Sequence, residues 1–227
     1  MSVASNLAEV RARIERAAQA AGRDPAGVKL VAVSKTKAAE LIREAHAAGQ
    51  RAFGENYAQE LAGKAEALAD LRDLEWHFIG HLQTNKARVV AAHAQVVHTI
   101  DSAALARELG KRVAKLGRAA PMPVLIEVSV AGEAQKAGAA PSEIDEVMHA
   151  VAEQPSLALR GLMTVPPEGD LQAARRVFET LVSLRNLHGG PRVLPELSMG
   201  MSHDLEVAVA CGATIVRVGT AIFGART

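Results

Sequence analysis

The sequence predicts an α/β protein built as a single (β/α)8 TIM barrel with one extra helix at its N-terminus. Three observations lead to this prediction. Eight short apolar segments with the character of strands recur along the 227 residues, and segments of helical length and periodicity alternate with them. No linker or low-complexity stretch divides the chain, so residues 1–227 are expected to form one domain. A hydrophobic content of 49% is enough for the core of one barrel of this size.

The expected elements begin with a helix over residues 2–23. It carries Glu9 and Glu15 among its arginines, which is unusual for a targeting peptide, so it is expected to belong to the fold. The prolines at 121, 123, 166 and 167 are interpreted as local breaks at strand edges. The eight strands are expected over residues 28–34, 51–54, 75–80, 96–101, 124–130, 159–164, 194–199 and 214–218.

An open doubly wound sheet is the competing architecture. Such a sheet usually has fewer strands and a glycine-rich first turn, whereas the turn after the first strand reads Ser34-Lys-Thr-Lys37 and contains no glycine. The barrel is therefore favoured. In a barrel the functional residues lie at the C-terminal ends of the strands, and the first strand neighbours the eighth where the sheet closes.

Lys35 is the first candidate functional residue, because it directly follows the first expected strand. An amine that is partly desolvated at such a position has a lowered pKa and can attack a carbonyl group to form a Schiff base. The alternative is a solvated lysine that opens the next helix.

Two segments near the C-terminus have the composition of anion sites. Ser198 to Ser202 span the end of the seventh expected strand and the residues after it, and Gly219 and Thr220 follow Arg217 of the eighth. Small and hydroxyl residues between a strand and a helix leave backbone N–H groups available to a phosphate, although N-capping by Ser202 and Thr220 is the alternative. Closure of the barrel would bring both segments to Lys35. A lysine beside a phosphate site suits a phosphorylated aldehyde, and pyridoxal phosphate is one.

Composition excludes several other classes of function. The formal net charge of +1 and an aromatic content of 3% leave neither a basic stripe nor a stacking surface, so a nucleic-acid partner is not expected. No apolar run is long enough to span a membrane. The single cysteine, Cys211, is interpreted as a small core residue. A cytoplasmic location and a monomeric state are expected.

Two histidines have the spacing of a metal pair but are not expected to bind one. His77 falls within the third expected strand and His81 lies beyond Gly80, so their side chains would not converge as they would on one helix face. His77 is instead expected at the rim of the pocket or just behind it. Asp101 and Ser102 are interpreted as a helix cap.

Blocks spread over nearly the whole chain resemble the pyridoxal phosphate homeostasis protein family. That density of matching positions makes the resemblance more specific than any one motif. The blocks are Ala32-Val-Ser-Lys35-Thr-Lys, Phe53-Gly-Glu-Asn56-Tyr57, Trp76-His-Phe-Ile-Gly80-His-Leu-Gln-Thr-Asn85-Lys86, His98-Thr-Ile-Asp101-Ser, Arg160-Gly-Leu-Met163, Leu197-Ser-Met-Gly-Met-Ser202 and Val218-Gly-Thr-Ala-Ile-Phe-Gly.

The resemblance implies a fold like the N-terminal barrel of alanine racemase, holding pyridoxal 5'-phosphate on a lysine without established turnover. It also assigns residues. The family's Schiff-base lysine falls on Lys35, its ring-nitrogen partner on Arg217, and its phosphate contacts on Ser198 or Ser202 with Gly219 and Thr220. Asn56 and Met199 match positions that line the cofactor, and Lys136 matches a lysine near the mouth of the site.

Three classes of function remain open on the sequence alone. The first is a carrier that holds the reactive aldehyde and delivers it to pyridoxal phosphate-dependent apoenzymes. The second is a pyridoxal phosphate enzyme acting on amino acids, such as a racemase. The third is an aldolase that uses Lys35 on a sugar phosphate with no cofactor.

Overall fold

The computed structural model describes residues 2–130 and 137–225, and these residues form a closed parallel barrel. The strands follow one another around the barrel in sequence order, and β8 pairs with β1 to close it. The (β/α)8 prediction is therefore confirmed. The strands are β1 (Lys29–Val33), β2 (Ala52–Glu55), β3 (Glu75–Phe78), β4 (Val96–Ile100), β5 (Met122–Glu127), β6 (Leu157–Met163), β7 (Glu196–Ser198) and β8 (Ile215–Val218).

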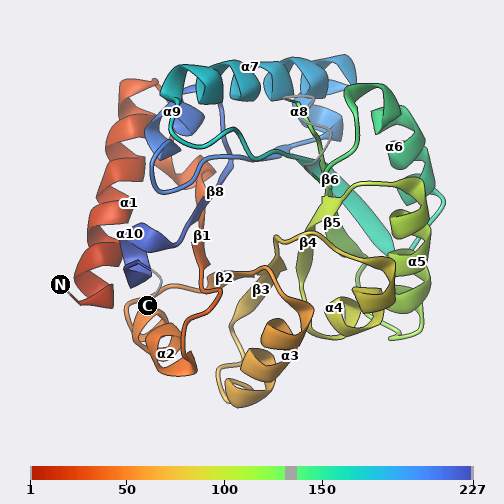
Figure 1. The fold of residues 1–227 in the computed structure, drawn as a ribbon, viewed down its shortest axis with the longest axis horizontal. Helices are drawn as coiled ribbons and strands as arrows, with labels where there is room; N and C mark the ends of the chain where they lie inside the picture. The colour runs from red at the N-terminus through yellow and green to blue at the C-terminus, as the bar shows by residue number, and fades with distance from the viewer. Residues whose placement is uncertain (1, 131–136, 226–227) are drawn as a thin grey trace.

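Helices surround the sheet, as Figure 1 shows. Their buried residues recur at spacings of three and four, so each helix packs one face against the strands. The helices are α1 (Val3–Ala20), α2 (Ala39–Ala47), α3 (Ala58–Ala67), α4 (Ala87–His93), α5 (Ala103–Ala114), α6 (Ile144–Ala152), α7 (Leu171–Leu187), α8 (Gly190–Val193), α9 (Leu205–Ala210) and α10 (Thr220–Phe223).

The extra N-terminal helix covers the place where the barrel closes. The Ser2 hydroxyl accepts a hydrogen bond from the Ser5 amide and caps α1, and Leu7, Val10 and Ile14 are buried beneath it. The helix packs against α9 and α10, which follow β7 and β8 (Figure 1). Helix α1 therefore supports the segments that the sequence predicts to bind an anion.

The strand boundaries differ from the predicted ones by a few residues. The seventh strand is the clearest case, because it was expected to start at Leu194 but starts at Glu196. Gly189 and Gly190 both have positive φ, and Pro191 follows them at the start of the short helix α8, whose C-cap is Leu194. The fifth strand starts earlier than expected, at Met122, and ends at Glu127 rather than at residue 130.

The inside of the barrel contains an apolar layer and polar side chains. Side chains alternate between the helix side and the barrel axis along each strand. The apolar layer on the axis consists of Val31, Ala52, Val96, Leu125, Met163 and Ile215. The polar residues His77, His98, Ser198 and Arg217 are also at least 96% buried. Such groups need hydrogen-bond partners, and these are described below.

Candidate cofactor-binding site

A cavity of about 680 Å³ opens at the C-terminal ends of the strands. The loops after β1, β2, β3, β6, β7 and β8 supply its walls. Its lining residues are Val33, Lys35, Asn56, Ile79, Val165, Pro167, Glu168, Gly169, Asp170, Leu171, Ala174, Met201, Ser202, His203, Asp204, Arg217, Gly219 and Thr220. The position agrees with the general rule that barrels of this type bind ligands at this end.

Six of the residues singled out from the sequence lie together in this wall. Lys35 and Asn56 come from the ends of β1 and β2, and the other four come from the ends of β7 and β8: Ser202, Arg217, Gly219 and Thr220. The amine is thus on the same cavity as the residues predicted to bind an anion. Lys136 lies outside the described residues.

Three of the predicted site residues do not line the cavity: Ser198, Met199 and His77. Ser198 and Met199 are fully buried, and the Ser198 hydroxyl accepts a hydrogen bond from Arg217 Nη1 at 2.7 Å. His77 lies inside the barrel on β3 rather than at the rim of the cavity. Of the two serines considered for the phosphate, only Ser202 is among the cavity-lining residues.

The anion end of the cavity is formed by two tight turns. A Cβ at Gly219 would lie 3.1 Å from the Val33 carbonyl oxygen, so glycine lets the turn after β8 press against the end of β1. Gly219 and Thr220 begin helix α10, where the first N–H groups have no acceptor within the helix. The Ser202 hydroxyl is 3.4 Å from the Ala221 amide, which tethers the turn after β7 to α10.

Arg217 forms the wall between these turns and the barrel interior. Its Nη1 donates to Ser198 Oγ at 2.7 Å and its Nη2 donates to the Thr164 carbonyl oxygen at 2.9 Å. Burial lowers the pKa of Arg217 to about 10, with the nearby charges of Glu127 and Asp204 opposing that shift. The side chain is therefore a fixed cation at neutral pH. A guanidinium has five N–H donors, so donors remain for a ligand.

The turn that carries Lys35 rests on a buried ion cluster. Lys64 Nζ of α3 donates to the Ser34 carbonyl oxygen at 2.6 Å, to Glu55 Oε1 at 2.7 Å and to Glu60 Oε1 at 2.6 Å. The Ser34 hydroxyl donates to Glu55 Oε1 at 2.6 Å, and the Thr36 amide donates to Glu60. These contacts hold Thr36 in a left-handed conformation with φ of 62°, which a β-branched residue rarely adopts. The cluster thereby fixes the backbone on both sides of Lys35.

Asn56 contributes an unsatisfied acceptor to the cavity. Its Oδ1 is buried and has no hydrogen-bond partner among the described residues. Gly80 lies against the Asn56 backbone, where a Cβ would clash with it, so the turn after β3 holds Asn56 in place. A ligand in the cavity could supply the missing donor.

The sequence-based prediction missed the residues that support this site. Glu55 and Lys64 are buried charges on β2 and α3, and His98 and Glu127 are buried on β4 and β5. A glutamate at the end of an apolar strand, followed nine positions later by a lysine on the inner face of a helix, was an available signal for the first pair. Among the described residues, no group of three or more histidine, cysteine or acidic side chains could hold a metal ion.

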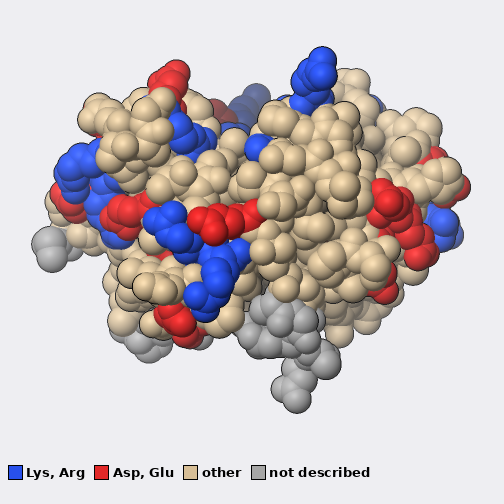
Figure 2. All heavy atoms as spheres, turned by 90° about the horizontal axis from the view of Figure 1, so that it is seen from above, with Lys and Arg blue, Asp and Glu red and all other residues tan. Residues whose placement is uncertain are grey.

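The surface gives two further observations. On the face shown in Figure 2, positive and negative side chains lie beside one another between larger uncharged areas. None of the helices that the structure describes is long and apolar enough to cross a membrane.

Comparison with known proteins gives consistent matches over the whole chain. The family model for the N-terminal domain of alanine racemase matches residues 5–227. A pyridoxal phosphate homeostasis protein from Pseudomonas aeruginosa is 51% identical over 227 residues, covering 99% of this chain and 96% of that protein. The protein of the same name from Escherichia coli K12 is 47% identical over 232 residues, covering 99% of this chain and 97% of that protein.

Solved structures show the same relationship. PipY of Synechococcus elongatus PCC7942, determined with pyridoxal phosphate bound, is 38% identical with a TM-score of 0.83, and the match covers 98% of this chain and 100% of PipY. Alanine racemase from Corynebacterium glutamicum has a TM-score of 0.69 at 20% identity, and the match covers 98% of this chain and 61% of the racemase. At that identity the likeness is one of fold alone.

Proposed function

This chain belongs to the pyridoxal phosphate homeostasis protein family, and from that premise we propose that it binds pyridoxal 5'-phosphate in the cavity at the C-terminal end of the barrel, as a Schiff base with Lys35. One observation carries the proposal. The cavity joins the lysine after β1 to two small-residue turns after β7 and β8, with a fixed arginine between them. An aldehyde, a phosphate and a ring nitrogen would each meet a suitable partner there.

The cavity fits this ligand in size and in chemistry. A volume of about 680 Å³ lies in the usual range for sites of cofactor size. Gly219 lets the turn after β8 lie against the end of β1 at the wall of the cavity, and Ser202 and Thr220 add hydroxyl groups at the same end. We assign the phosphate to these three residues, the ring nitrogen to Arg217, and a polar substituent of the ligand to the unsatisfied Asn56 Oδ1. Ser198 and Met199 support the site from behind.

Arg217 favours a carrier over an amino-acid enzyme. The bound cofactor would supply an aldehyde and a ring that can withdraw electrons, and a carboxylate beside the ring nitrogen strengthens that withdrawal by keeping the nitrogen protonated. Arg217 is a donor that keeps its own proton at neutral pH, even with its pKa lowered to about 10. The ring is then a weak electron sink. We therefore propose that the protein holds the cofactor and delivers it to apoenzymes within the cytoplasm, acting as a monomer without significant racemase turnover.

Covalent capture tests the proposal directly. Reduction of the loaded protein with borohydride, followed by peptide mass analysis, should place the cofactor adduct on Lys35. Lys35→Ala should lose the visible absorbance of the bound cofactor. Lys37→Ala is a matched control two residues away, because the Lys37 amine donates to the Ala225 carbonyl oxygen at 2.7 Å rather than lining the cavity. An adduct on Lys37, or on no residue, would refute the assignment. Absence of colour before any substrate is added would instead favour the cofactor-free aldolase.

Turnover separates the carrier from an enzyme. Loaded protein incubated with L-alanine in deuterated water should show slow α-deuteration or none, because racemisation needs acid–base groups on both faces of the substrate carbon. The only tyrosine, Tyr57, has 58% of its surface exposed and is not among the cavity-lining residues. Rapid deuteration with accumulation of D-alanine would overturn the carrier proposal. Transfer of cofactor from the loaded protein to a panel of apoenzymes would test delivery itself.

A further inference from the structure

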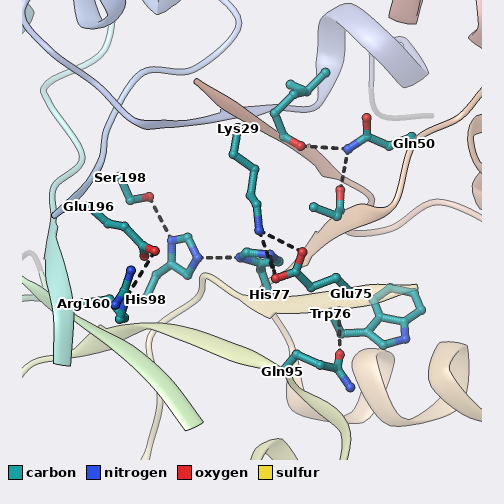
Figure 3. A network of polar contacts seen from close by, with 12 residues as sticks. Lys29, Gln50, Glu75, Trp76, His77, Gln95, His98, Arg160, Glu196 and Ser198 are labelled. Carbon is teal, nitrogen blue, oxygen red and sulfur yellow. Dashed lines mark hydrogen bonds and ion pairs between the residues drawn. The ribbon is translucent and has the colours of Figure 1, made fainter. Parts of the chain in front are cut away.

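A row of polar side chains crosses the inside of the barrel and ends at Arg217. Ser198 Oγ accepts from Arg217 Nη1 at 2.7 Å and lies 2.8 Å from His98 Nδ1. His98 Nε2 lies 2.7 Å from His77 Nδ1, and His77 Nε2 lies 3.4 Å from Glu75 Oε1. Figure 3 shows the section from Ser198 through both imidazoles to Glu75, whose carboxylate also binds Lys29. The row thus links β8, β7, β4 and β3 across the barrel.

Donor and acceptor chemistry gives this row a single direction. Arg217 can only donate, so the Ser198 oxygen accepts and the serine proton is available for His98 Nδ1. A neutral His98 then carries its proton on Nε2 and donates to His77 Nδ1. His77 in turn carries its proton on Nε2, which faces the Glu75 carboxylate. At 3.4 Å this last contact is an electrostatic one, and His77 Nε2 has no hydrogen-bond partner among the described residues.

The opposite direction is disfavoured at both ends of the row. It would turn the lone pair of His77 Nε2 toward a carboxylate, which is repulsive. It would also make Arg217 and His98 both donate to the Ser198 oxygen, and no acceptor for the serine proton is described. Burial lowers the pKa of both imidazoles, that of His98 well below its ordinary value, which agrees with two neutral rings.

We propose that His98 and His77 are positioning residues, and that this one-directional hydrogen-bond chain orients the Ser198 oxygen so that Arg217 is held facing the cavity. The Thr164 carbonyl oxygen provides the second fixed acceptor, so both Nη groups of the guanidinium are anchored on the side away from the ligand. The proposal rests on the proposed function, because Arg217 is assigned there to the ring nitrogen of the cofactor.

Packing alone does not explain why these buried positions are polar. Neighbouring inward positions on β4 and β8 hold Val96 and Ile215, which fill the barrel without any hydrogen-bond requirement. The buried side chains of Ser198, His98 and His77 hydrogen-bond to one another in turn, so each fixes the orientation of the next. The result is a rigid support for one cation at the wall of the cavity.

Matched substitutions of His98 distinguish this support from packing. In His98→Asn, the amide oxygen takes the place of Nδ1 and still accepts from Ser198. In His98→Gln, the amide nitrogen takes the place of Nε2 and contacts His77, so the Ser198 proton loses its fixed acceptor. We expect His98→Asn to keep the absorption maximum of bound pyridoxal phosphate. We expect His98→Gln to shift it, and Ser198→Ala, which removes the acceptor for Arg217, to shift it and weaken binding about tenfold or more.

Two outcomes of these titrations would overturn the proposal. One is an equal loss of affinity for pyridoxal phosphate in His98→Asn and His98→Gln, which would indicate a packing role. The other is parent-like absorption and affinity in both His98→Gln and Ser198→Ala. The thermal midpoint of each cofactor-free variant, measured in parallel, separates a change at Arg217 from general destabilisation.

Imidazole ¹⁵N NMR of the parent protein without cofactor tests the direction of the chain and needs no substitution. Both His77 and His98 should be neutral at pH 7 with the proton on Nε2. A proton on Nδ1 of either ring, or a doubly protonated ring, would overturn the proposal even if the variants of His98 fail to fold. If the parent protein bound no pyridoxal phosphate at all, the proposed function would fail. The NMR result would still show in which direction the hydrogen bonds from Ser198 through His98 to His77 run.

Discussion

Glu127 offers the sharpest quantitative test of the electrostatics of the barrel. It is the last residue of β5, it is buried, and its Oε2 has no hydrogen-bond partner among the described residues. Burial raises the pKa of this carboxyl to about 7; Arg217 opposes the shift and Asp101 adds to it. The folded protein therefore retains a proton on Glu127 at a pH where the unfolded chain has released it.

The sign and size of the effect follow from that difference in pKa. Between the ordinary value of 4.5 and a folded value of about 7, the native state binds more protons than the unfolded state, so this group makes stability fall as pH rises through that window. At about 1.4 kcal/mol per pKa unit, the difference between 4.5 and about 7 corresponds to about 3.5 kcal/mol over the whole window. Glu127→Gln keeps the shape and removes the titration. Relative to the parent, the variant should thus gain up to about 3 kcal/mol between pH 5 and pH 8.

Urea unfolding of the cofactor-free parent and variant at several pH values between 5 and 8 measures this gain. The quantity to compare is the difference between the free energies of unfolding of variant and parent at each pH. His77 and His98 have lowered pKa values, so they make stability rise with pH below pH 6.5, where the unfolded chain takes up protons. Both histidines are present in the parent and the variant, so their contribution largely cancels. Glu44→Gln, at an exposed position, serves as a control for the same substitution at the surface. A difference between Glu127→Gln and parent that does not change with pH would refute the reasoning.

Two further predictions concern the cavity and its support. Thr220→Val should weaken binding of pyridoxal phosphate by about 1.5 to 3 kcal/mol by removing one hydrogen bond to the phosphate, and it should leave the weak binding of pyridoxal unchanged; equal affinity of variant and parent in a titration would mean that Thr220 is only a helix cap. Lys64→Met should destabilise the protein by about 3 kcal/mol or more, because two carboxylates, Glu55 and Glu60, lose their buried counterion. Adding Glu55→Gln should recover part of that loss in urea unfolding, and a double variant less stable than Lys64→Met alone would contradict the assignment.

The sequence predicted the fold, and that Lys35 lies near the turns after the seventh and eighth strands, because both depend on periodic features. Eight alternating units imply a closed parallel sheet, and closure alone brings Lys35 to Gly219 and Thr220. It could not separate Ser198 from Ser202, since that choice depends on where β7 ends and on which serine faces the barrel axis. In the structure β7 ends at Ser198, and the Ser198 hydroxyl accepts a hydrogen bond from Arg217.

The alignment of His77, His98 and Ser198 was missed because it depends on contacts between distant parts of the chain. His77 and His98 are 21 positions apart, and Ser198 is a further 100 positions away, so their alignment follows from the stagger of the strands around the barrel. Glu127 likewise has an ordinary local sequence, and its raised pKa comes from burial. Sequence periodicity determines which face of a strand a residue occupies, but not the height of that residue inside the barrel.

The distribution of supports around the cavity has a consequence for how a carrier could work. Arg217 is held from inside the barrel by Ser198 and Thr164, and the turns after β7 and β8 are held from outside by α1. Within α1, Arg13 donates to the Ser202 carbonyl oxygen at 3.0 Å and Asn6 donates to the Ile222 carbonyl oxygen at 2.8 Å. The Lys35 turn rests on the separate cluster around Lys64.

The proposed covalent contact and the proposed phosphate contacts therefore rest on different supports, which are joined where β1 pairs with β8 and where Lys37 Nζ donates to the Ala225 carbonyl oxygen. On the proposed assignment, the residues that would hold the phosphate and the ring nitrogen have supports other than the Lys35 turn, so they would stay in place whether or not Lys35 is bound to the ligand. A protein that releases an intact aldehyde benefits from this division, because the single covalent bond can be exchanged without dismantling the rest of the site. On the proposed assignment, the extra N-terminal helix also contributes to binding, since it contacts both segments assigned to the phosphate.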